Sequence, residues 1–99
     1  MSKSCYAAAK AGILGLTHGL AREAAPYVTV NAVCPGVIDT GMASSLTSGE
    51  EGRRTLGLIP LGRFGQPEDI AQVVAFLASE AAGYITGEEI DVNGGVYID

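Results

Sequence analysis

The sequence predicts an α/β fold, and this prediction depends on three observations along its 99 residues. Two segments have the composition of helices, two short segments have the composition of strands, and a long loop rich in glycine and proline follows the first strand. A strand, a crossover helix and a second strand in this order form a βαβ unit, whose strands run parallel with a right-handed connection.

A first helix is predicted over residues 4–25, because alanine and leucine dominate this segment and Pro26 ends it. Each glycine costs a helix about 0.5–1 kcal/mol relative to alanine, so several glycines on one face indicate a close-packed neighbour, either a sheet or another helix. The alternative is a helix that is simply flexible. The face concerned carries only small residues, spaced by three and four: Ala8, Gly12, Gly15 and Gly19.

The first strand is predicted over residues 28–34, whose β-branched and apolar side chains are typical of a buried strand in a parallel sheet. Pro35 and Gly36 end this strand. Residues 36–66 contain eight glycine and proline residues, which predicts a long loop with a short helix near residues 48–58. Long loops inside compact domains are usually lids or binding loops.

A second helix is predicted from Pro67 to Ala82, since its first turn has the proline and the acidic residues that helix N-termini prefer. A second strand is predicted from Glu88 to Val92, before a break at an Asn-Gly-Gly sequence. These two elements complete the predicted βαβ unit.

Composition excludes several classes of function. The net charge is −5, and the 6 basic residues form no cluster, so the chain lacks the phosphate contacts that nucleic-acid binding needs. No apolar run approaches the ~20 residues of a membrane span, and the N-terminus does not resemble a signal peptide. Two cysteines and one histidine without metal-ligand spacing predict neither a disulfide framework nor a metal site. We therefore expect a reduced, cytoplasmic protein.

Tyr6 and Lys10 are the first candidate catalytic residues. Four residues apart at the start of the first helix, they lie on one face, about one turn from each other. A nearby ammonium favours the phenolate form of a phenol and so makes the phenol a better proton donor. Taken alone, this spacing is also common on the surface of amphipathic helices, so it leaves both readings open.

Several motifs in a fixed order accompany this pair. They are Y-A-A-A-K at 6–10, V-N-A-V at 30–33, P-G-V-I-D-T at 35–40, P-L-G-R-F-G-Q-P-E-D-I at 60–70, Y-I-T-G at 84–87 and V-N-G-G at 92–95. Together they resemble the C-terminal part of the short-chain dehydrogenase/reductase family, over essentially the whole chain. Within that family the chain is most similar to the 3-oxoacyl-(acyl-carrier-protein) reductases. The resemblance implies the C-terminal portion of a Rossmann-like, doubly wound parallel sheet.

The resemblance assigns the catalytic roles. Tyr6 matches the general acid that protonates a carbonyl oxygen as hydride arrives at the carbon. Lys10 matches the residue that makes this phenol more acidic and hydrogen-bonds the nicotinamide ribose, so both residues also contribute to cofactor binding. Asn31 is expected to bond neighbouring backbone rather than to act in catalysis.

The resemblance also assigns a cofactor-binding turn after the first strand. Pro35 and Gly36 match the turn that lets the backbone approach the nicotinamide. The main chain of Ile38 matches a group that bonds the carboxamide, and the hydroxyl of Thr40 matches its partner. A turn at the carboxyl end of a parallel strand is where α/β sheets bind ligands.

Two features of the family have no match in this sequence. No glycine-rich turn of the form G-x-x-x-G-x-G or G-x-G-x-x-G is present to hold a pyrophosphate, and no serine stands far enough upstream of Tyr6 to bond a substrate carbonyl. We therefore expect residues 1–99 to form a single partial domain without the N-terminal dinucleotide-binding half. Its small-residue stripe and first strand would lack their usual neighbours, which predicts low stability as a monomer and a tendency to associate.

By family, the chain is expected to belong to an NAD(P)H-dependent oxidoreductase that reduces a 3-oxoacyl thioester to the 3-hydroxy product, and to be inactive alone. NADPH is the expected cofactor and NADH the alternative. The competing hypotheses are a non-catalytic interaction module and a truncated remnant. Either would pair, as a homo-oligomer, through the segments from Pro67 to Ala82 and from Glu88 to Val92.

A further candidate partner is an acyl-carrier protein. Arg53 and Arg54 in the long loop could contact such an acidic surface, although a solvated charge pair is the simpler interpretation. The loop from Gly41 to Gly65 is expected to shape the substrate pocket.

Overall fold

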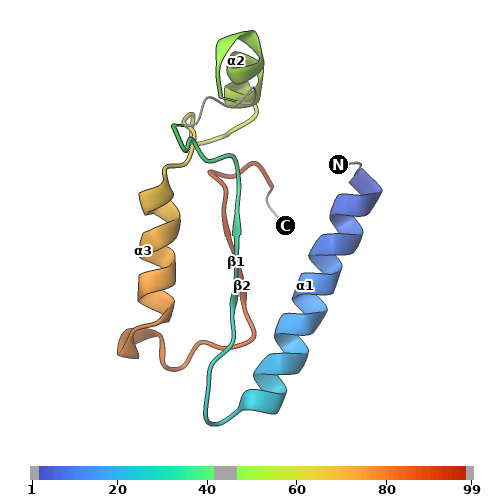
Figure 1. Cartoon of the computed structure of the whole chain (residues 1–99), viewed down its shortest axis with the longest axis vertical. Coiled ribbons are helices and arrows are strands. Elements are labelled where there is room, and N and C mark those ends of the chain that lie inside the picture. Colours follow the sequence, from blue (N-terminus) through green and yellow to red (C-terminus); the bar gives the residue numbers. More distant parts are fainter. Residues whose placement is uncertain (1–2, 42–46, 98–99) are drawn as a thin grey trace. The chain divides into compact units, whose positions relative to one another are not determined.

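Helices and strands follow one another in the predicted order in the computed structural model, which describes residues 3–41 and 47–97 (Figure 1). The elements in order are α1 (Lys3–Ala24), β1 (Ala32–Pro35), α2 (Gly49–Gly57), α3 (Pro67–Leu77), the 3₁₀ turn η1 (Glu80–Ala82) and β2 (Glu89–Val92). β1 and β2 are neighbours in a two-stranded sheet. The α/β prediction is therefore confirmed.

The chain divides into two compact units. The first unit comprises Met1–Ala32 and Phe76–Ile90, and the second comprises Val33–Ala75 and Asp91–Asp99. Strand pairing keeps one register in both units. Ala32 N donates to Glu88 O at 2.9 Å in the first, and Gly36 N donates to Val92 O at 2.9 Å in the second. The same step of four residues on both strands is the pattern of a parallel pair.

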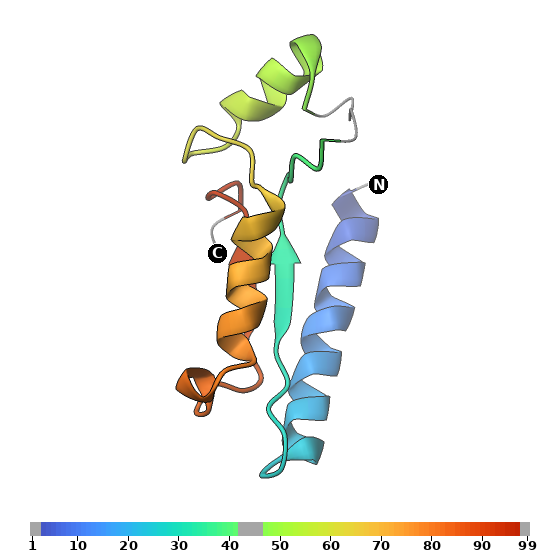
Figure 2. The same ribbon diagram turned by 60° about the vertical axis from the view of Figure 1, so that its left-hand side comes forward.

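Helix α1 is the longest element of the first unit, with 22 residues that continue without a break (Figure 2). Its buried positions are small: Ala21 is 4% exposed, and Thr17 is 5% exposed with its hydroxyl donating to Ile13 O at 2.7 Å. The predicted small-residue stripe is bare. A Cβ added at Gly12, Gly15 or Gly19 would meet nothing within 4 Å.

Strand β1 begins later than the sequence predicts, at Ala32 rather than near residue 28. Side chains replace the regular ladder just before it. Val30 N donates to Thr86 Oγ1 at 3.0 Å, and Glu88 N donates to Asn31 Oδ1 at 3.0 Å. The strand is also half-buried rather than buried as expected.

Helix α3 ends earlier than expected, at Leu77 rather than Ala82. Ser79 closes the helix, because its hydroxyl and its backbone N–H both donate to Phe76 O, at 2.6 and 3.0 Å. Serine commonly competes with a helix backbone in this way. Residues 80–82 then form η1, in which Ala82 is only 1% exposed.

Close backbone approaches hold the second unit together. Gly65 N donates to Val37 O at 2.9 Å and Asp39 N donates to Gly65 O at 2.8 Å, so residues 37–39 pair with the loop before α3. At Gly36 an added Cβ would lie 2.7 Å from both Cα and Cβ of Asn93. Only glycine fits there without a shift of the backbone.

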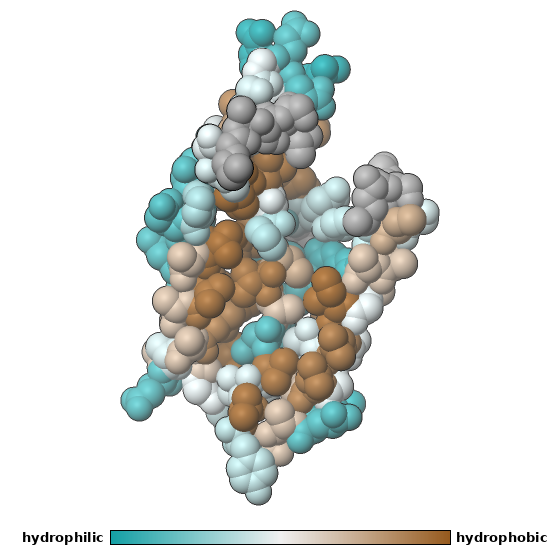
Figure 3. All heavy atoms as spheres, in the orientation of Figure 1, coloured by the Kyte–Doolittle hydropathy of each residue, from teal (hydrophilic) through white to brown (hydrophobic). Residues whose placement is uncertain are grey.

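Among the described residues, no helix is both long and apolar enough to cross a lipid bilayer. Apolar side chains nevertheless lie open on α1, as the brown atoms over this helix show (Figure 3). Ile13 is 47% exposed and Leu16 is 63% exposed. This surface has the character of one that another protein segment covers.

Candidate functional site

The structure brings Tyr6 and Lys10 together on α1, as their spacing predicts. The ammonium nitrogen of Lys10 lies 6.0 Å from the centroid of the Tyr6 ring, at the outer limit of a cation–π contact. The Tyr6 side chain is 39% exposed, so the phenol is open to a reactant. A phenol beside an ammonium on one rigid helix can donate a proton and have the resulting negative charge stabilised.

Glu89 at the start of β2 adds a carboxylate to this pair. Its Oε1 atom lies 3.2 Å from Nζ of Lys10, and the two side chains are 11% and 21% exposed respectively. Oε1 is shielded from water and accepts no well-aligned hydrogen bond from the described residues, so the ion pair compensates its burial. Nothing in the sequence distinguishes Glu89 from its acidic neighbours as the partner of Lys10.

Asn31 fixes the segment that leads into Glu89. Its side-chain amide donates to Ile85 O at 3.3 Å and its oxygen accepts from Glu88 N at 3.0 Å. Gly87 N adds a backbone bond to Val30 O at 2.7 Å. The prediction that Asn31 bonds neighbouring backbone is confirmed, and its amide ties residues 85–88 to the start of β1.

The predicted cofactor turn lies in the second unit, directly after β1. Gly36 N is held by Val92 O, and Ile38 is half-buried and pairs in parallel with Gly65 in an isolated bridge. Pro35 and Thr40 are exposed. The backbone of this segment is thus fixed on one side by β2 and the loop before α3.

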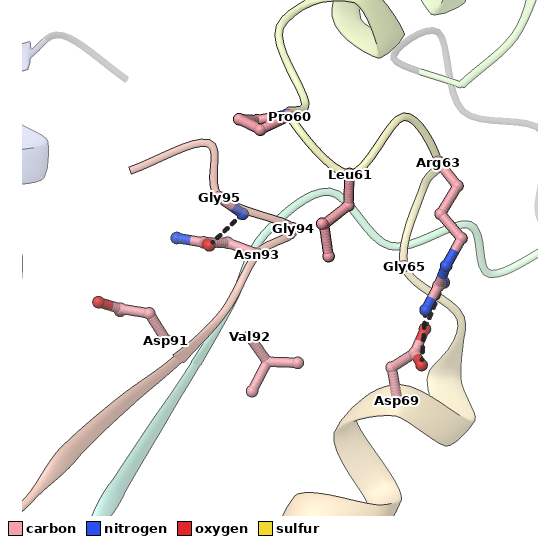
Figure 4. Close-up of a pocket in the computed structure, with 10 residues that line it drawn as sticks. All are labelled: Pro60, Leu61, Arg63, Gly65, Asp69, Asp91, Val92, Asn93, Gly94 and Gly95. Atoms are coloured by element: carbon pink, nitrogen blue, oxygen red, sulfur yellow. Dashed lines mark hydrogen bonds and ion pairs between the residues drawn. The ribbon is translucent and has the colours of Figure 1, made fainter. Parts of the chain in front are cut away.

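A cavity of about 510 Å³ opens beside this segment within the second unit (Figure 4). It lies between the loop at Pro60 and Leu61, the start of α3, and the turn that follows β2. Gly94 belongs to that turn, and its φ of +62° favours glycine. None of the predicted site residues lines this cavity. The loop expected to shape a pocket runs partly through residues 42–46, which lie outside the described residues.

An ion pair borders the cavity. Arg63 donates twice to the carboxylate of Asp69, at 2.9 and 3.2 Å (Figure 4). Gln66 N donates to the same carboxylate at 2.7 Å. The hydrogen bond from Arg63, followed by that from Gln66, lowers the pKa of Asp69 to about 2. The same hydrogen bond and the charge of Asp69 raise the pKa of Arg63. This pair caps the start of α3 and was not anticipated from the sequence.

Comparison with known proteins identifies the class. A family model described as Enoyl-(Acyl carrier protein) reductase matches residues 1–97. Among solved structures, a short-chain dehydrogenase/reductase from Brucella melitensis superposes with a TM-score of 0.84 and 46% identity, covering 95% of this chain and 38% of that one. The chain belongs to the short-chain dehydrogenase/reductase family.

Curated relatives are more specific in name. The 3-oxoacyl-(acyl-carrier-protein) reductase FabG of Pseudomonas aeruginosa is 55% identical over 94 residues, which are 94% of this chain and 38% of the relative. The acetoacetyl-CoA reductase of Rhizobium meliloti is 51% identical over 98 residues, which are 98% of this chain and 41% of the relative. The chain thus spans about two fifths of the length of these relatives.

Each unit offers groups that are chemically suited to part of a nicotinamide dinucleotide. In the first unit, a phenol and an ammonium on α1 are donors suited to ribose hydroxyls and to a carbonyl oxygen. In the second unit, considered by itself, Thr40 offers an exposed hydroxyl beside a fixed backbone segment. For the pyrophosphate, by contrast, the sequence offers no glycine-rich turn. The fit is therefore to the nicotinamide and its ribose.

Proposed function

We propose that this chain is the catalytic-helix portion of an NADPH-dependent reductase that converts a 3-oxoacyl thioester into its 3-hydroxy product. The observation that carries the proposal is the Tyr6–Lys10 pair on α1, with Nζ 6.0 Å from the ring centroid and Tyr6 39% exposed. The identity to reductases of 3-oxoacyl substrates, spread over 94% of the chain, supports the same reaction.

Residues of this chain would supply the proton for the reduction and stabilise the charge that remains. When bound, NADPH would supply the hydride for the carbonyl carbon. The hydroxyl of Tyr6 would donate its proton to the carbonyl oxygen. Lys10 stabilises the phenolate that remains, because its ammonium lies beside the ring. The product is the alcohol, and the phenolate regains a proton from solvent through its exposed position. Lys10 would also bond the nicotinamide ribose.

The turn from Pro35 to Thr40 would bind the nicotinamide itself. The backbone at Gly36 is anchored to Val92, so this segment would be a rigid edge for the ring. The main chain of Ile38 and the hydroxyl of Thr40 would bond the carboxamide. NADH remains the competing cofactor.

A chimaera tests the proposal without leaving out any of this chain. The chain replaces its matched segment in the Pseudomonas aeruginosa relative, and NADPH oxidation is followed with acetoacetyl-CoA and, separately, with crotonyl-CoA. We expect reduction of acetoacetyl-CoA, because a 3-oxoacyl carbonyl is the proposed target. Preference for crotonyl-CoA would instead favour the carbon–carbon double bond named in the description of the family model.

Two tyrosine variants make the chimaera test specific. Tyr6→Phe removes the proposed acid and should lower turnover by about 10²–10⁴-fold, the usual contribution of a positioned acid. Tyr84→Phe is the matched control, because this tyrosine is 103% exposed. A folded chimaera that binds NADPH and whose turnover is unchanged by Tyr6→Phe would refute the role of Tyr6.

The second candidate function is pairing without catalysis, through the segments from Pro67 to Ala82 and from Glu88 to Val92. It is favoured by two exposed apolar residues of α3, since Val74 is 50% exposed and Phe76 is 47% exposed. The mass of the chain in solution, measured by sedimentation, tests it. Val74→Glu should shift a dimer to monomer, while Gln72→Glu on the same helix should not. A monomer in the unmodified chain would remove this function.

Titration of the unmodified chain with NADPH separates the two functions. Saturable binding would show that the residues of this chain hold the nucleotide without a glycine-rich turn. Pairing without binding would favour the interaction module.

Arg53 and Arg54 are proposed to contact an acidic carrier protein, and Arg54 already pairs with Glu51 at 3.0 Å.

A further inference from the structure

The carboxylate of Glu89 has a place in the first unit that the family motifs leave without a role. It stands at the first residue of β2, and its Oε1 lies 3.2 Å from the Lys10 ammonium. The side chain of Glu89 is 11% exposed. A carboxylate so far removed from water is retained as an ion only when an opposite charge compensates it.

The neighbouring residues hold Glu89 in this position. Glu88 is bonded on both sides of its peptide, because its N–H donates to Asn31 Oδ1 at 3.0 Å and its carbonyl accepts from Ala32 N at 2.9 Å. Side chains alternate across a strand, so Glu88 and Glu89 point to opposite faces. Glu88 is exposed, whereas Glu89 faces Lys10.

The Lys10 ammonium therefore lies near two groups, the Glu89 carboxylate and the Tyr6 ring. Glu89 Oε1 is 3.2 Å from Nζ and the Tyr6 ring centroid is 6.0 Å away. A lysine side chain has a flexible four-carbon stem, so without the Glu89 contact its ammonium would sample many positions along the helix surface.

We propose that Glu89 is a positioning residue, which acts through Lys10 by holding its ammonium charged and beside the Tyr6 phenol. The effect of Glu89 on catalysis rests on the proposed function of the Tyr6–Lys10 pair. The contact itself is independent of any cofactor. Glu89 does not touch the reacting atoms, and its effect reaches them only through the location and charge of the ammonium.

Chemical labelling of the two lysines tests the proposal directly. Lys3 and Lys10 are the only lysines in the sequence, and each can be followed by mass spectrometry after brief treatment with an acylating ester. Acylation requires the neutral amine, and a neighbouring carboxylate favours the charged form. In the unmodified chain we expect Lys10 to react more slowly than Lys3, and urea to abolish this difference.

Three variants assign the protection to Glu89. Glu89→Gln keeps the shape of the side chain but removes its charge, and should raise the rate at Lys10 relative to Lys3 by roughly threefold to tenfold. Glu89→Asp keeps the charge and should restore part of the protection. Glu88→Gln removes the same charge from the adjacent, exposed residue and should leave the ratio unchanged.

Either of two results would overturn the proposal: equal reactivity of both lysines in the folded, unmodified chain, or the same change in Glu88→Gln as in Glu89→Gln. Helical circular dichroism shows whether each variant is folded, and the urea comparison on the unmodified chain needs no variant. The labelling is carried out without nucleotide, so its result does not depend on whether the chain binds NADPH. NADPH binding is measured in a separate titration, whose result does not depend on the protection of Lys10.

Discussion

The two units of the molecule use the same residue, glycine, in opposite ways. In the first unit, Gly12, Gly15 and Gly19 of α1 have open space where a side chain would stand. In the second unit, Cβ atoms added at Gly36 and Gly65 would come within 2.7 and 2.5 Å of Asn93 and Ile38. In the first unit the glycines lower the stability of a helix, whereas in the second unit they allow close packing.

The candidate chemistry is divided in a similar way. In the first unit, Tyr6 and Lys10 lie together because a helix places every fourth residue on one face. In the second unit, the turn after β1 is fixed by bonds to residues far along the chain, such as Val92 and Gly65. Local spacing therefore builds the proposed catalytic pair, and long-range pairing builds the proposed cofactor turn.

The largest expected effect concerns the half-buried Lys10–Glu89 ion pair of the first unit. Lys10→Met removes the counter-charge of Glu89, and because the two side chains are 21% and 11% exposed, the loss should cost up to about 3 kcal/mol in the free energy of unfolding, the lower end for a fully buried pair. We expect a marked loss of helical circular dichroism at low urea concentration. The double variant Lys10→Met/Glu89→Leu should recover most of it, and a failure to recover would mean that Lys10 stabilises the fold by another contact.

A smaller loss is expected from Gly36→Ala in the second unit. The added methyl would lie 2.7 Å from backbone and side-chain carbons of Asn93, so the chain must shift. Overpacking of this kind costs about 1–3 kcal/mol. The urea midpoint should fall accordingly, and an unchanged midpoint would show that the turn after β2 moves freely.

The same substitution in the first unit should have the opposite sign. Gly15→Ala adds a methyl where nothing lies within 4 Å, and replaces glycine within a helix. We expect stabilisation by about 0.5–1 kcal/mol, seen as a higher thermal midpoint. Destabilisation would reveal that this face is covered in solution, and the mass of the unmodified chain would then identify a self-associated form.

The smallest effect is the pH dependence of the ion pair before α3. Its folded pKa of about 2 lies below the ordinary value of 3.8, so the stabilisation from Asp69 is present above about 3.8 and is lost as pH falls through about 2. Asp69→Asn should lower the urea midpoint at neutral pH and differ little from the unmodified chain near pH 2. Glu68→Gln, at an exposed neighbour, serves as the control.

The sequence predicted most elements because their signals are local. The short helix expected near residues 48–58 is α2, Gly49–Gly57, and the last strand lies within one residue of its expected start. The errors fall where side chains compete with the backbone. Ser79 ended α3 early, and Asn31 replaced the first part of the β1 ladder.

By itself, the sequence determined the α/β order, the family and the adjacency of Tyr6 and Lys10, because helix period and motif order are properties of neighbouring residues. Only the tertiary structure decided which carboxylate faces Lys10, which glycine has no room for a side chain, and which residue pairs with Arg63. The contacts of Glu89 and Gly36 join residues far apart along the chain, and chain folding alone determines which of many such pairs meet.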